Sequence, residues 1–469
     1  MAKVELLSPA GSLKNMRYAF KYGADAVYAG QPRYSLRVRN NDFNFETLQT
    51  GIEEAHSLGK KLFVASNIIP HNSKIKTYMK DIAPVIDLKP DALIMADPGL
   101  IMMVREKFPE QEIHLSVQAN AVNYATVKFW HTMGLKRVIL SRELSLDEIK
   151  EIRQECPEME LEVFVHGALC IAYSGRCLLS GYFNHRDPNQ GSCTNSCRWK
   201  YDVKDAVETI EGDIVERNPP IPVENKEIIL DRFGNEPLEN IVLLEEEGRK
   251  GELMPAYEDE HGTYIMNSKD LRAVEHVKTL IDIGVTSLKI EGRTKSHYYA
   301  ARTASVYRAA IDNALAGKDF DPTSFGILEN LANRGYTDGF YRRHQPEELQ
   351  TYFDNYSRSN KQQVVGEILE YKDGKALINV KNKFSIGDSI EVILPSGSFE
   401  TKVLSIVRDK NGEELDAAKG SGYIVWIPLD LSDIENIEFG FIARNFESIK
   451  IKTKNLLKDD NAKIRRPAW

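Results

Sequence analysis

The chain has 469 residues, of which 42% are hydrophobic and 28% charged, and its formal net charge is −8. This length allows two or three domains with sizeable cores. No apolar run reaches the roughly 18 residues that a membrane span needs, and the first residues do not resemble a secretory leader. We therefore expect no membrane partner and a cytoplasmic location.

The first 300 residues alternate short apolar runs with polar turns and helical stretches. Fully apolar strands that alternate with helices are typical of a parallel sheet covered by helices. Eight such strands predict a TIM-like (β/α)8 barrel over residues 1–325, with an open doubly wound sheet as the alternative. The expected strands are residues 4–7, 26–28, 61–65, 92–95, 113–117, 137–140, 161–165 and 287–290.

Polar side chains follow these strands at their carboxyl ends, where (β/α)8 barrels hold their active sites. Several are arginines, and guanidinium groups bind carboxylates and phosphates bidentately, which predicts an anionic ligand at the barrel mouth. Surface ion pairs and helix capping are the alternative roles. The catalytic candidates are His166, Arg142, Glu143 and Glu291. The substrate-binding candidates are Arg33, Arg37, Gln118, Asn120, Lys289 and Arg293.

An insertion over about residues 167–266 interrupts the alternation between the seventh and eighth strands. It begins with four of the five cysteines, spaced C-x6-C-x15-C-x3-C. Four clustered thiolates need a cation between them. Only the last pair has the spacing of a structural zinc site, whereas iron–sulfur clusters accept varied spacings. The residues therefore favour iron–sulfur, with zinc and unliganded thiols as alternatives. The candidate ligands are Cys170, Cys177, Cys193 and Cys197.

The negative charge is concentrated behind these cysteines. Residues 202–260 contain 18 Asp/Glu against 6 Lys/Arg, a net charge of −12, so the rest of the chain carries +4. We expect a solvated, partly mobile excursion in this acidic segment. The stretch that follows it, residues 258–271, is expected to add a strand beside the barrel.

A basic and aromatic linker, residues 326–361, follows the barrel and contains NRGYTDGFYRRHQ. Cations hold phosphates and aromatic rings stack on unpaired bases, so this stretch predicts an RNA contact. A glycine-hinged linker that packs its aromatic residues on the barrel is the alternative. The RNA-contact candidates are Arg334, Tyr336, Arg342 and Arg343.

The pattern changes again after the linker. Residues 362–449 alternate apolar and polar residues between Asp-Gly and Ser-Gly turns, which predicts a small antiparallel β-barrel domain. The tail, residues 450–469, has seven Lys/Arg against two Asp, which suits phosphate contact or a solvated end. The chain contains no H-E-x-x-H, G-x-S-x-G or P-loop motif.

The run E-x-F-x-x-G-A-L-C-x4-G-x-C-x-L-S, residues 162–180, resembles the collagenase-like peptidase family U32. The opening ELLSPAGSLKNMRYAF, the block HLSVQANAVNYATVKFW and SLKIEGRTKS are similar to a branch of that family that takes part in tRNA hydroxylation. The resemblance covers most of residues 1–345 and extends more weakly through the β-domain.

The resemblance also implies a reaction, the hydroxylation of the wobble uridine of tRNA at C5 to give 5-hydroxyuridine. It implies prephenate as the source of the hydroxyl group and an iron–sulfur cluster, [4Fe–4S], on the four clustered cysteines. The expected partners are tRNA, prephenate and either an iron–sulfur assembly system or a second protein subunit. Two alternatives stay open at this stage: a peptidase, as the family name says, and a non-catalytic tRNA-binding or assembly factor.

Overall fold

The chain forms two compact units, and the boundary between them along the sequence lies near residue 360. The computed structural model describes residues 4–36, 42–169, 201–208, 214–216, 241–246, 253–259, 262–263, 269–333, 335–342, 362–398, 402–431 and 435–446. Among these residues, no helix combines the length and the hydropathy that crossing a membrane requires.

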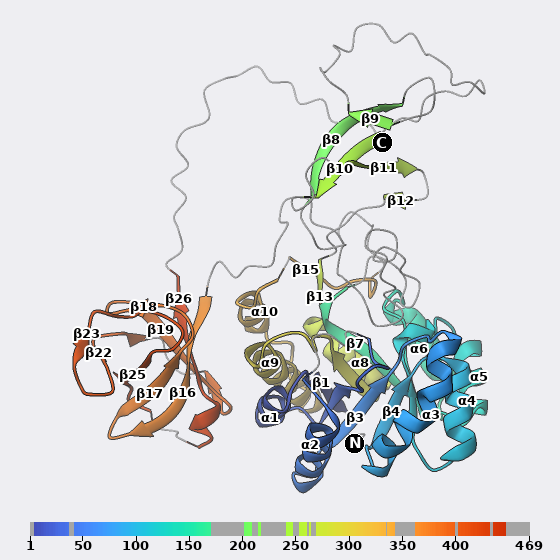
Figure 1. Ribbon diagram of the computed structural model, residues 1–469, viewed down its shortest axis with the longest axis horizontal. Coiled ribbons are helices and arrows are strands. Elements are labelled where there is room, and N and C mark those ends of the chain that lie inside the picture. The colour runs from blue at the N-terminus through green and yellow to red at the C-terminus, as the bar shows by residue number, and fades with distance from the viewer. Residues whose placement is uncertain are drawn as a thin grey trace, which may run out of the picture. The chain divides into compact units, whose positions relative to one another are not determined.

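The first unit contains a closed barrel of parallel strands (Figure 1). The barrel closes because the last strand pairs with both the first and the seventh. This closure confirms the predicted TIM-like barrel and excludes the open sheet. The strands are β1 (Glu5–Pro9), β2 (Ala26–Gly30), β3 (Lys61–Ser66), β4 (Ala92–Met95), β5 (Ile113–Leu115), β6 (Arg137–Ile139), β7 (Glu160–Ala168) and β14 (Ser287–Ile290).

Helices cover the outside of the barrel, and polar residues at their first turns fix where they start. Asn44 and Ser145 form reciprocal capping boxes with Thr47 and Glu148, and Ser296 caps α9. The helices are α1 (Leu13–Lys21), α2 (Phe45–Ser57), α3 (Asn72–Asp87), α4 (Pro98–Lys107), α5 (Tyr124–Thr132), α6 (Leu146–Glu155), α8 (Val277–Ile283), α9 (His297–Leu315) and α10 (Thr323–Glu329). Two short 3-10 helices, η2 (Val117–Ala119) and η5 (Val274–His276), lie between them.

The insertion leaves the barrel at the end of β7 and returns beside it. Strand β13 (Asp270–Arg272) runs antiparallel to β7, with Asp270 opposite Ala168, and β15 (Tyr336–Thr337) pairs with β13. The strand expected next to the barrel is therefore confirmed.

The acidic segment contains strands that its composition did not predict. Five strands form one antiparallel sheet over these residues, a regular structure that the expectation of a solvated, partly mobile excursion did not include. Three of these strands contain Val or Ile, which favour strand formation despite the net negative charge. The strands are β8 (Tyr201–Glu208), β9 (Ile214–Glu216), β10 (Ile241–Glu246), β11 (Leu253–Asp259) and β12 (Gly262–Thr263).

The second unit is a curled antiparallel sheet (Figure 1), as the alternating pattern predicted. Its longest strand pairs with strands on both sides, and register shifts in both pairings help the sheet to curl. Its core includes Ile378, Phe384, Val425 and Ile442. The strands of this sheet are β16 (Gln362–Lys372), β17 (Lys375–Val380), β19 (Ser389–Leu394), β20 (Gly397–Ser398), β21 (Lys402–Val403), β22 (Val407–Arg408), β23 (Glu414–Leu415), β25 (Ile424–Pro428) and β26 (Phe441–Asn445). Two further strands, β18 (Phe384–Ser385) and β24 (Ala417–Ala418), pair with each other as a separate two-stranded sheet.

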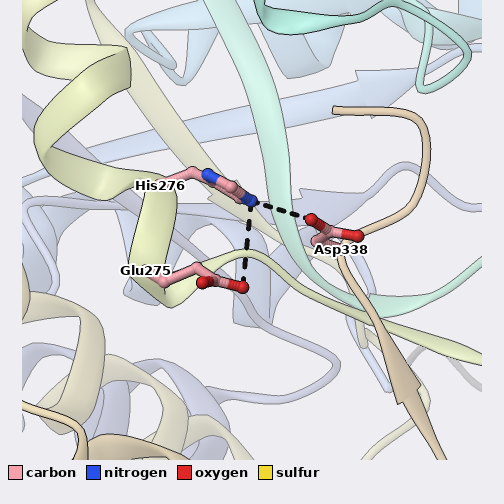
Figure 2. Close-up of side chains that lie close together, drawn as sticks. All are labelled: Glu275, His276 and Asp338. Carbon is pink, nitrogen blue, oxygen red and sulfur yellow. Dashed lines mark hydrogen bonds and ion pairs between the residues drawn. The ribbon is translucent and has the colours of Figure 1, made fainter. Parts of the chain in front are cut away.

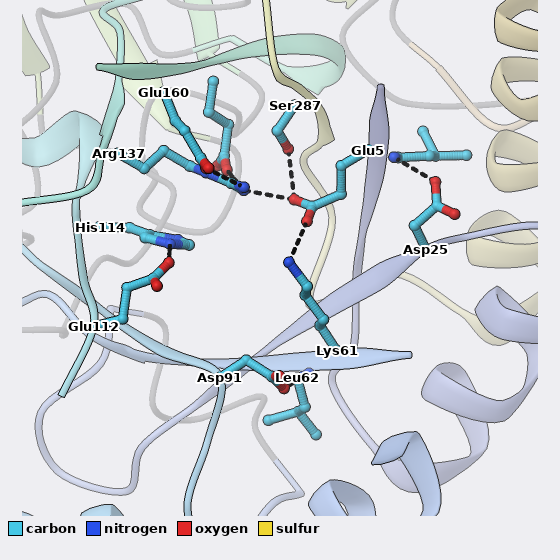
Figure 3. A network of polar contacts seen from close by, with 12 residues as sticks. Glu5, Asp25, Lys61, Leu62, Asp91, Glu112, His114, Arg137, Glu160 and Ser287 are labelled. Atoms are coloured by element: carbon cyan, nitrogen blue, oxygen red, sulfur yellow. Dashed lines mark hydrogen bonds and ion pairs between the residues drawn. The ribbon is translucent and has the colours of Figure 1, made fainter. Parts of the chain in front are cut away.

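The interior of the (β/α)8 barrel holds a network of buried charges. Arg137 forms ion pairs with Glu5 at 2.5 Å and Glu162 at 3.0 Å, and Glu5 also accepts a hydrogen bond from Ser287 (Figure 3). Lys289 Nζ lies 2.8 Å from Glu162. The Arg137 guanidinium also lies 5.5 Å from the centre of the Phe63 ring, which belongs to β3 across the barrel. The network therefore lies inside the barrel rather than under its helices.

Glu162 is the central acid of this network and is fully buried. Burial raises the pKa of its carboxyl group, but the ion pairs with Lys289 and Arg137 outweigh burial and hold the pKa below its usual value. A carboxyl group with a depressed pKa stabilises the fold above its unfolded pKa, and this contribution is lost as the pH falls through the folded value.

We expect Glu162→Gln to lower the free energy of unfolding by about 3–5 kcal/mol at pH 7, because Lys289 and Arg137 each lose a buried partner. Urea unfolding measures this loss. Glu155→Gln is the control, and its effect is much smaller because solvent screens the exposed pair between Glu155 and Lys128. The difference between wild type and Glu162→Gln narrows below about pH 4. Equal losses in the two variants would contradict the role of the network.

Candidate active site

Hydrogen bonds connect the loops around the carboxyl end of the barrel. Ser141, after β6, contacts the side-chain oxygen of Asn120 at 2.9 Å and the carboxylate of Glu143. Asn67, after β3, donates to Ser116 Oγ at 3.1 Å. These bonds fix the loops after β3, β5 and β6 with respect to one another.

Three cations surround two aromatic rings at this end of the barrel. The Arg142 guanidinium lies 3.9 Å from the centre of the Phe164 ring. Lys289 Nζ lies 4.4 Å from the Tyr28 ring, and the Arg293 guanidinium lies 5.7 Å from it. A cation over a ring face is held by a weak attraction, and each of these cations also has a polar partner elsewhere in the chain. We call these five residues the cation–aromatic site, and it has the composition of an anion-binding site.

Glu291 is fixed beside this site by its side chain and its backbone. Its carboxylate lies 3.2 Å from Arg142 Nη2. Its backbone N–H donates to the carbonyl of His166 at 2.9 Å, and its carbonyl accepts a hydrogen bond from the Tyr299 hydroxyl at 2.8 Å. Burial lowers the pKa of Lys289 although the Glu162 and Glu291 carboxylates oppose this shift. The site therefore combines buried cations with one oriented carboxylate.

Gly167 joins this site to the start of the cysteine stretch. It has φ +105°, and a Cβ atom at this position would lie 2.5 Å from the backbone oxygen of Glu291. Only glycine allows so close an approach of two backbones. Leu169, two residues later, is buried, and it is the last residue described before the cysteines. The predicted metal ligands, Cys170, Cys177, Cys193 and Cys197, lie outside the described residues.

His166 faces away from the cation–aromatic site. A β-bulge in β7, opposite Lys289 and Ile290, turns its ring toward α9. The ring lies 5.8 Å from Tyr299 and 5.6 Å from Tyr307, both in α9, and burial lowers its pKa to about 3. This neutral, enclosed position corrects the expectation that His166 lines the mouth as a catalytic group.

The remaining predicted site residues are more scattered. Arg33 is exposed and paired with Asp81 of α3 at 2.8 Å. Gln118 lies in η2, and Asn120 ends it with φ +54°. Arg37 lies outside the described residues. Of the predicted set, the structure brings Arg142, Glu291, Lys289 and Arg293 together, with Asn120 and Glu143 in the neighbouring loops.

The described part of the linker packs on the barrel. The Tyr336 hydroxyl donates to the carbonyl of Leu328 at 3.1 Å, and Arg272 lies 4.9 Å from its ring. Arg342 is paired within the chain, at 2.5 Å from Glu275 and 3.0 Å from Asp338. These contacts match the alternative reading of a packed linker. Arg334 and Arg343 lie outside the described residues.

Glu275, His276 and Asp338 form a second polar cluster (Figure 2). His276 Nε2 lies 3.0 Å from Asp338 Oδ2 and 3.9 Å from Glu275 Oε1. Arg342 contacts both carboxylates and offsets part of their negative charge. The cluster ties the linker to η5.

Sequence reasoning missed Tyr28, Phe164 and Tyr299. Tyr28 and Phe164 lie within apolar strands, where an aromatic residue is indistinguishable from ordinary core. Tyr299 lies inside a predicted helix. Only the closure of the barrel brings the first two rings next to the predicted cations.

Comparison with known proteins then identifies the family. The sequence pattern of Peptidase family U32 matches residues 11–351, and that of the Peptidase family U32 C-terminal domain matches residues 360–444. The chain belongs to peptidase family U32. The resemblance found in the sequence is thereby confirmed.

Two members of this family are similar over nearly the whole chain. The tRNA hydroxylation protein P of Escherichia coli (strain K12) is 61% identical over 447 residues, which cover 95% of this chain and 98% of that protein. The protein of the same name from Haemophilus influenzae is 58% identical over 458 residues, 97% of this chain and 98% of that protein. A 23S rRNA 5-hydroxycytidine synthase of Escherichia coli (strain K12) is 30% identical over 347 residues, 72% of this chain and 45% of that protein.

We expect Gly167→Ala to lower the free energy of unfolding by more than about 2 kcal/mol, because the new Cβ collides with backbone that cannot move aside. Gly317→Ala is the matched control. Gly317 also has a left-handed backbone, with φ +71°, but nothing lies within 4 Å of its Cβ position. The control is expected to lose about 1 kcal/mol from backbone strain alone. Thermal unfolding of both variants measures the difference, and equal losses would contradict the close contact.

We expect His166→Phe to make the fold less sensitive to acid. The unfolded chain protonates this histidine near pH 6.5, whereas the folded chain does so only near pH 3. The wild-type protein therefore loses stability relative to the variant as the pH falls from about 6.5, by up to roughly 1.4 kcal/mol per pH unit. Urea unfolding at pH 7, 5.5 and 4.5 measures the difference. Parallel pH profiles would show that His166 is not buried in neutral form.

Proposed function

We propose that this protein takes part in tRNA hydroxylation and forms 5-hydroxyuridine at the wobble position, with prephenate as the source of the hydroxyl group. The observation that carries the proposal is the 61% identity, over 95% of the chain, to a tRNA hydroxylation protein P. A more distant family member is named for the hydroxylation of ribosomal cytidine, which supports RNA hydroxylation as the reaction class.

The cation–aromatic site supports an anionic small molecule as co-substrate. Prephenate carries two carboxylates, and guanidinium and ammonium groups are the usual carboxylate partners in proteins. Arg142 and Arg293 belong to the loops after β6 and β14, and Lys289 is the third cation. We assign the carboxylates of the co-substrate to these three groups, with Glu291 orienting Arg142.

The four clustered cysteines support an iron–sulfur cluster as the cofactor. Four thiolates are the donor set of a [4Fe–4S] cluster, and zinc is the alternative for the same donors. With all four cysteines bound, the cluster supplies electron transfer or structural support rather than an open metal position. Leu169, which directly precedes Cys170, is buried and lies two residues after Gly167, whose backbone approaches that of Glu291. This position along the chain supports a cofactor near the cation–aromatic site.

Complementation tests the proposed function. In a bacterial strain that lacks its own relative of this protein, the wild-type gene is expected to restore 5-hydroxyuridine in tRNA, measured by mass spectrometry of digested nucleosides. Cys170→Ala is expected to reduce the modified nucleoside at least tenfold, because the cluster loses a ligand. Cys156→Ala is the control, since Cys156 is a buried thiol outside the cluster. Full restoration by Cys170→Ala would remove the cluster from the reaction.

The same proteins, purified without air, test the cofactor directly. The wild type is expected to contain iron and sulfide and to absorb broadly in the visible range, whereas Cys170→Ala loses this band. A colourless wild type with about one zinc per chain would assign a structural metal instead. Cleavage of gelatin by the cofactor-free protein would support the peptidase alternative. Binding of tRNA without turnover in the presence of prephenate would support the assembly-factor alternative.

A further inference from the structure

We propose that one end of the C-terminal sheet binds an unpaired stretch of tRNA. The surface, called here the basic end, consists of Lys381, Asn382, Lys383, Lys419 and Tyr423. The identity of the RNA rests on the proposed function, whereas the surface follows from the second unit alone.

Strand pairing brings the two loops of the basic end together. The backbone N–H of Val380, the last residue of β17, donates to the carbonyl of Tyr423 at 2.9 Å. Phe384 of β18 pairs with Ala418 of the antiparallel β24, so Lys383, which precedes Phe384, and Lys419, which follows Ala418, are next to each other in the register. The loops 381–383 and 419–423 therefore lie side by side.

The basic end carries a net positive charge, because among the described residues only one of its three lysines has an ion-pair partner. Neither loop contains an acidic residue. Lys383 and Lys419 are exposed, and among the residues that the structure describes they have no ion-pair partner. Lys381 lies 3.5 Å from Glu367, which is buried.

The opposite end of the same sheet shows the contrast. Three exposed lysines occur there, but exposed acidic residues lie within a few residues of two of them along the chain, and the third donates to the backbone carbonyl of Asp430. These residues are Lys372, Lys375 and Lys402 with Glu370, Asp373 and Asp430. The lysines of the basic end are therefore not a general property of the sheet surface.

An exposed aromatic ring accompanies the lysines. Tyr423 is 41% exposed, and its backbone N–H closes a turn onto the carbonyl of Gly420. Gly420 and Gly422 both have positive φ, which allows a tight turn, and neither glycine places a bulky side chain next to the tyrosine. Lysines that contact phosphates next to a ring that stacks on a base are the two elements of single-strand recognition.

The chemistry favours an unpaired stretch over a duplex. In an A-form duplex the bases are stacked on each other, and a protein ring has no base face to contact. The loops of a tRNA offer unstacked bases together with closely spaced phosphates. An acidic protein surface would use the lysines but would leave the exposed tyrosine without a role.

The test is tRNA binding by the full-length protein, measured by fluorescence anisotropy with a labelled full-length tRNA transcript over a range of KCl concentrations. The double variant Lys383→Ser/Lys419→Ser is expected to bind about tenfold more weakly at 0.15 M salt. The slope of log affinity against log salt is expected to become shallower by roughly 1.4, about 0.7 for each lost contact to single-stranded RNA. The control Lys372→Ser/Lys375→Ser removes the same charge from the opposite end and is expected to change affinity less than twofold.

Tyr423 is tested separately from the charges. Tyr423→Ala is expected to weaken binding about tenfold with an unchanged salt slope, because stacking is lost but no charge is. Tyr423→Phe keeps the ring and is expected to bind like the wild type. Thermal unfolding confirms that each variant is folded, and Tyr423→Leu replaces Tyr423→Ala if the latter is not.

The outcomes separate this inference from the proposed function. If the wild type binds tRNA and both double variants bind equally well, the basic end is not the RNA contact, and the proposed function is untouched. If Tyr423→Phe is as weak as Tyr423→Ala, the ring does not stack on a base and the inference is wrong in that part. If the wild type does not bind tRNA, then tRNA is not the partner of this protein. The proposed function and this inference are then both wrong.

Discussion

The ion pairs of Glu162 with Arg137 and Lys289 are the interaction on which the rest of the barrel depends. A barrel interior normally fills with branched apolar residues, whereas here charged groups from β1, β6, β7 and β14 meet inside it. Lys289 belongs both to this network and to the cation–aromatic site. The charges in the middle of the barrel therefore also position one member of the cation–aromatic site.

The seam between β7 and β14 serves three purposes at once. It closes the barrel, it fixes the backbone of Glu291, and it starts the chain toward the cysteines. Gly167 and the bulge before it make this possible, because they let the two strands approach while His166 turns outward. A substitution at this seam is therefore expected to affect both the stability of the fold and the geometry of the candidate site.

The sequence predicted the barrel well, because each strand is a short apolar run and Ser or Asn marks the start of several helices. It also predicted Arg142, Glu291, Lys289 and Arg293 at the mouth, since strand ends converge there. It was wrong about His166, because a one-residue bulge reverses the direction of a side chain and leaves no trace in composition. The sequence could not show that Arg342 and Tyr336 have partners within the chain, because composition does not distinguish a cation or ring that packs internally from one that faces solvent; their RNA contact stays a prediction.

The pairing of Ala168 with Asp270 has a consequence for how the length of the insertion can change in evolution. The two ends of the insertion sit opposite each other across neighbouring strands, as at the base of a hairpin. The barrel therefore closes in the same way whatever length of chain lies between them, and the loop-closure entropy changes only slowly with that length. This junction is a natural point for segments to be gained, lost or exchanged, and the acidic segment can diverge between relatives while the barrel around Glu162 stays unchanged.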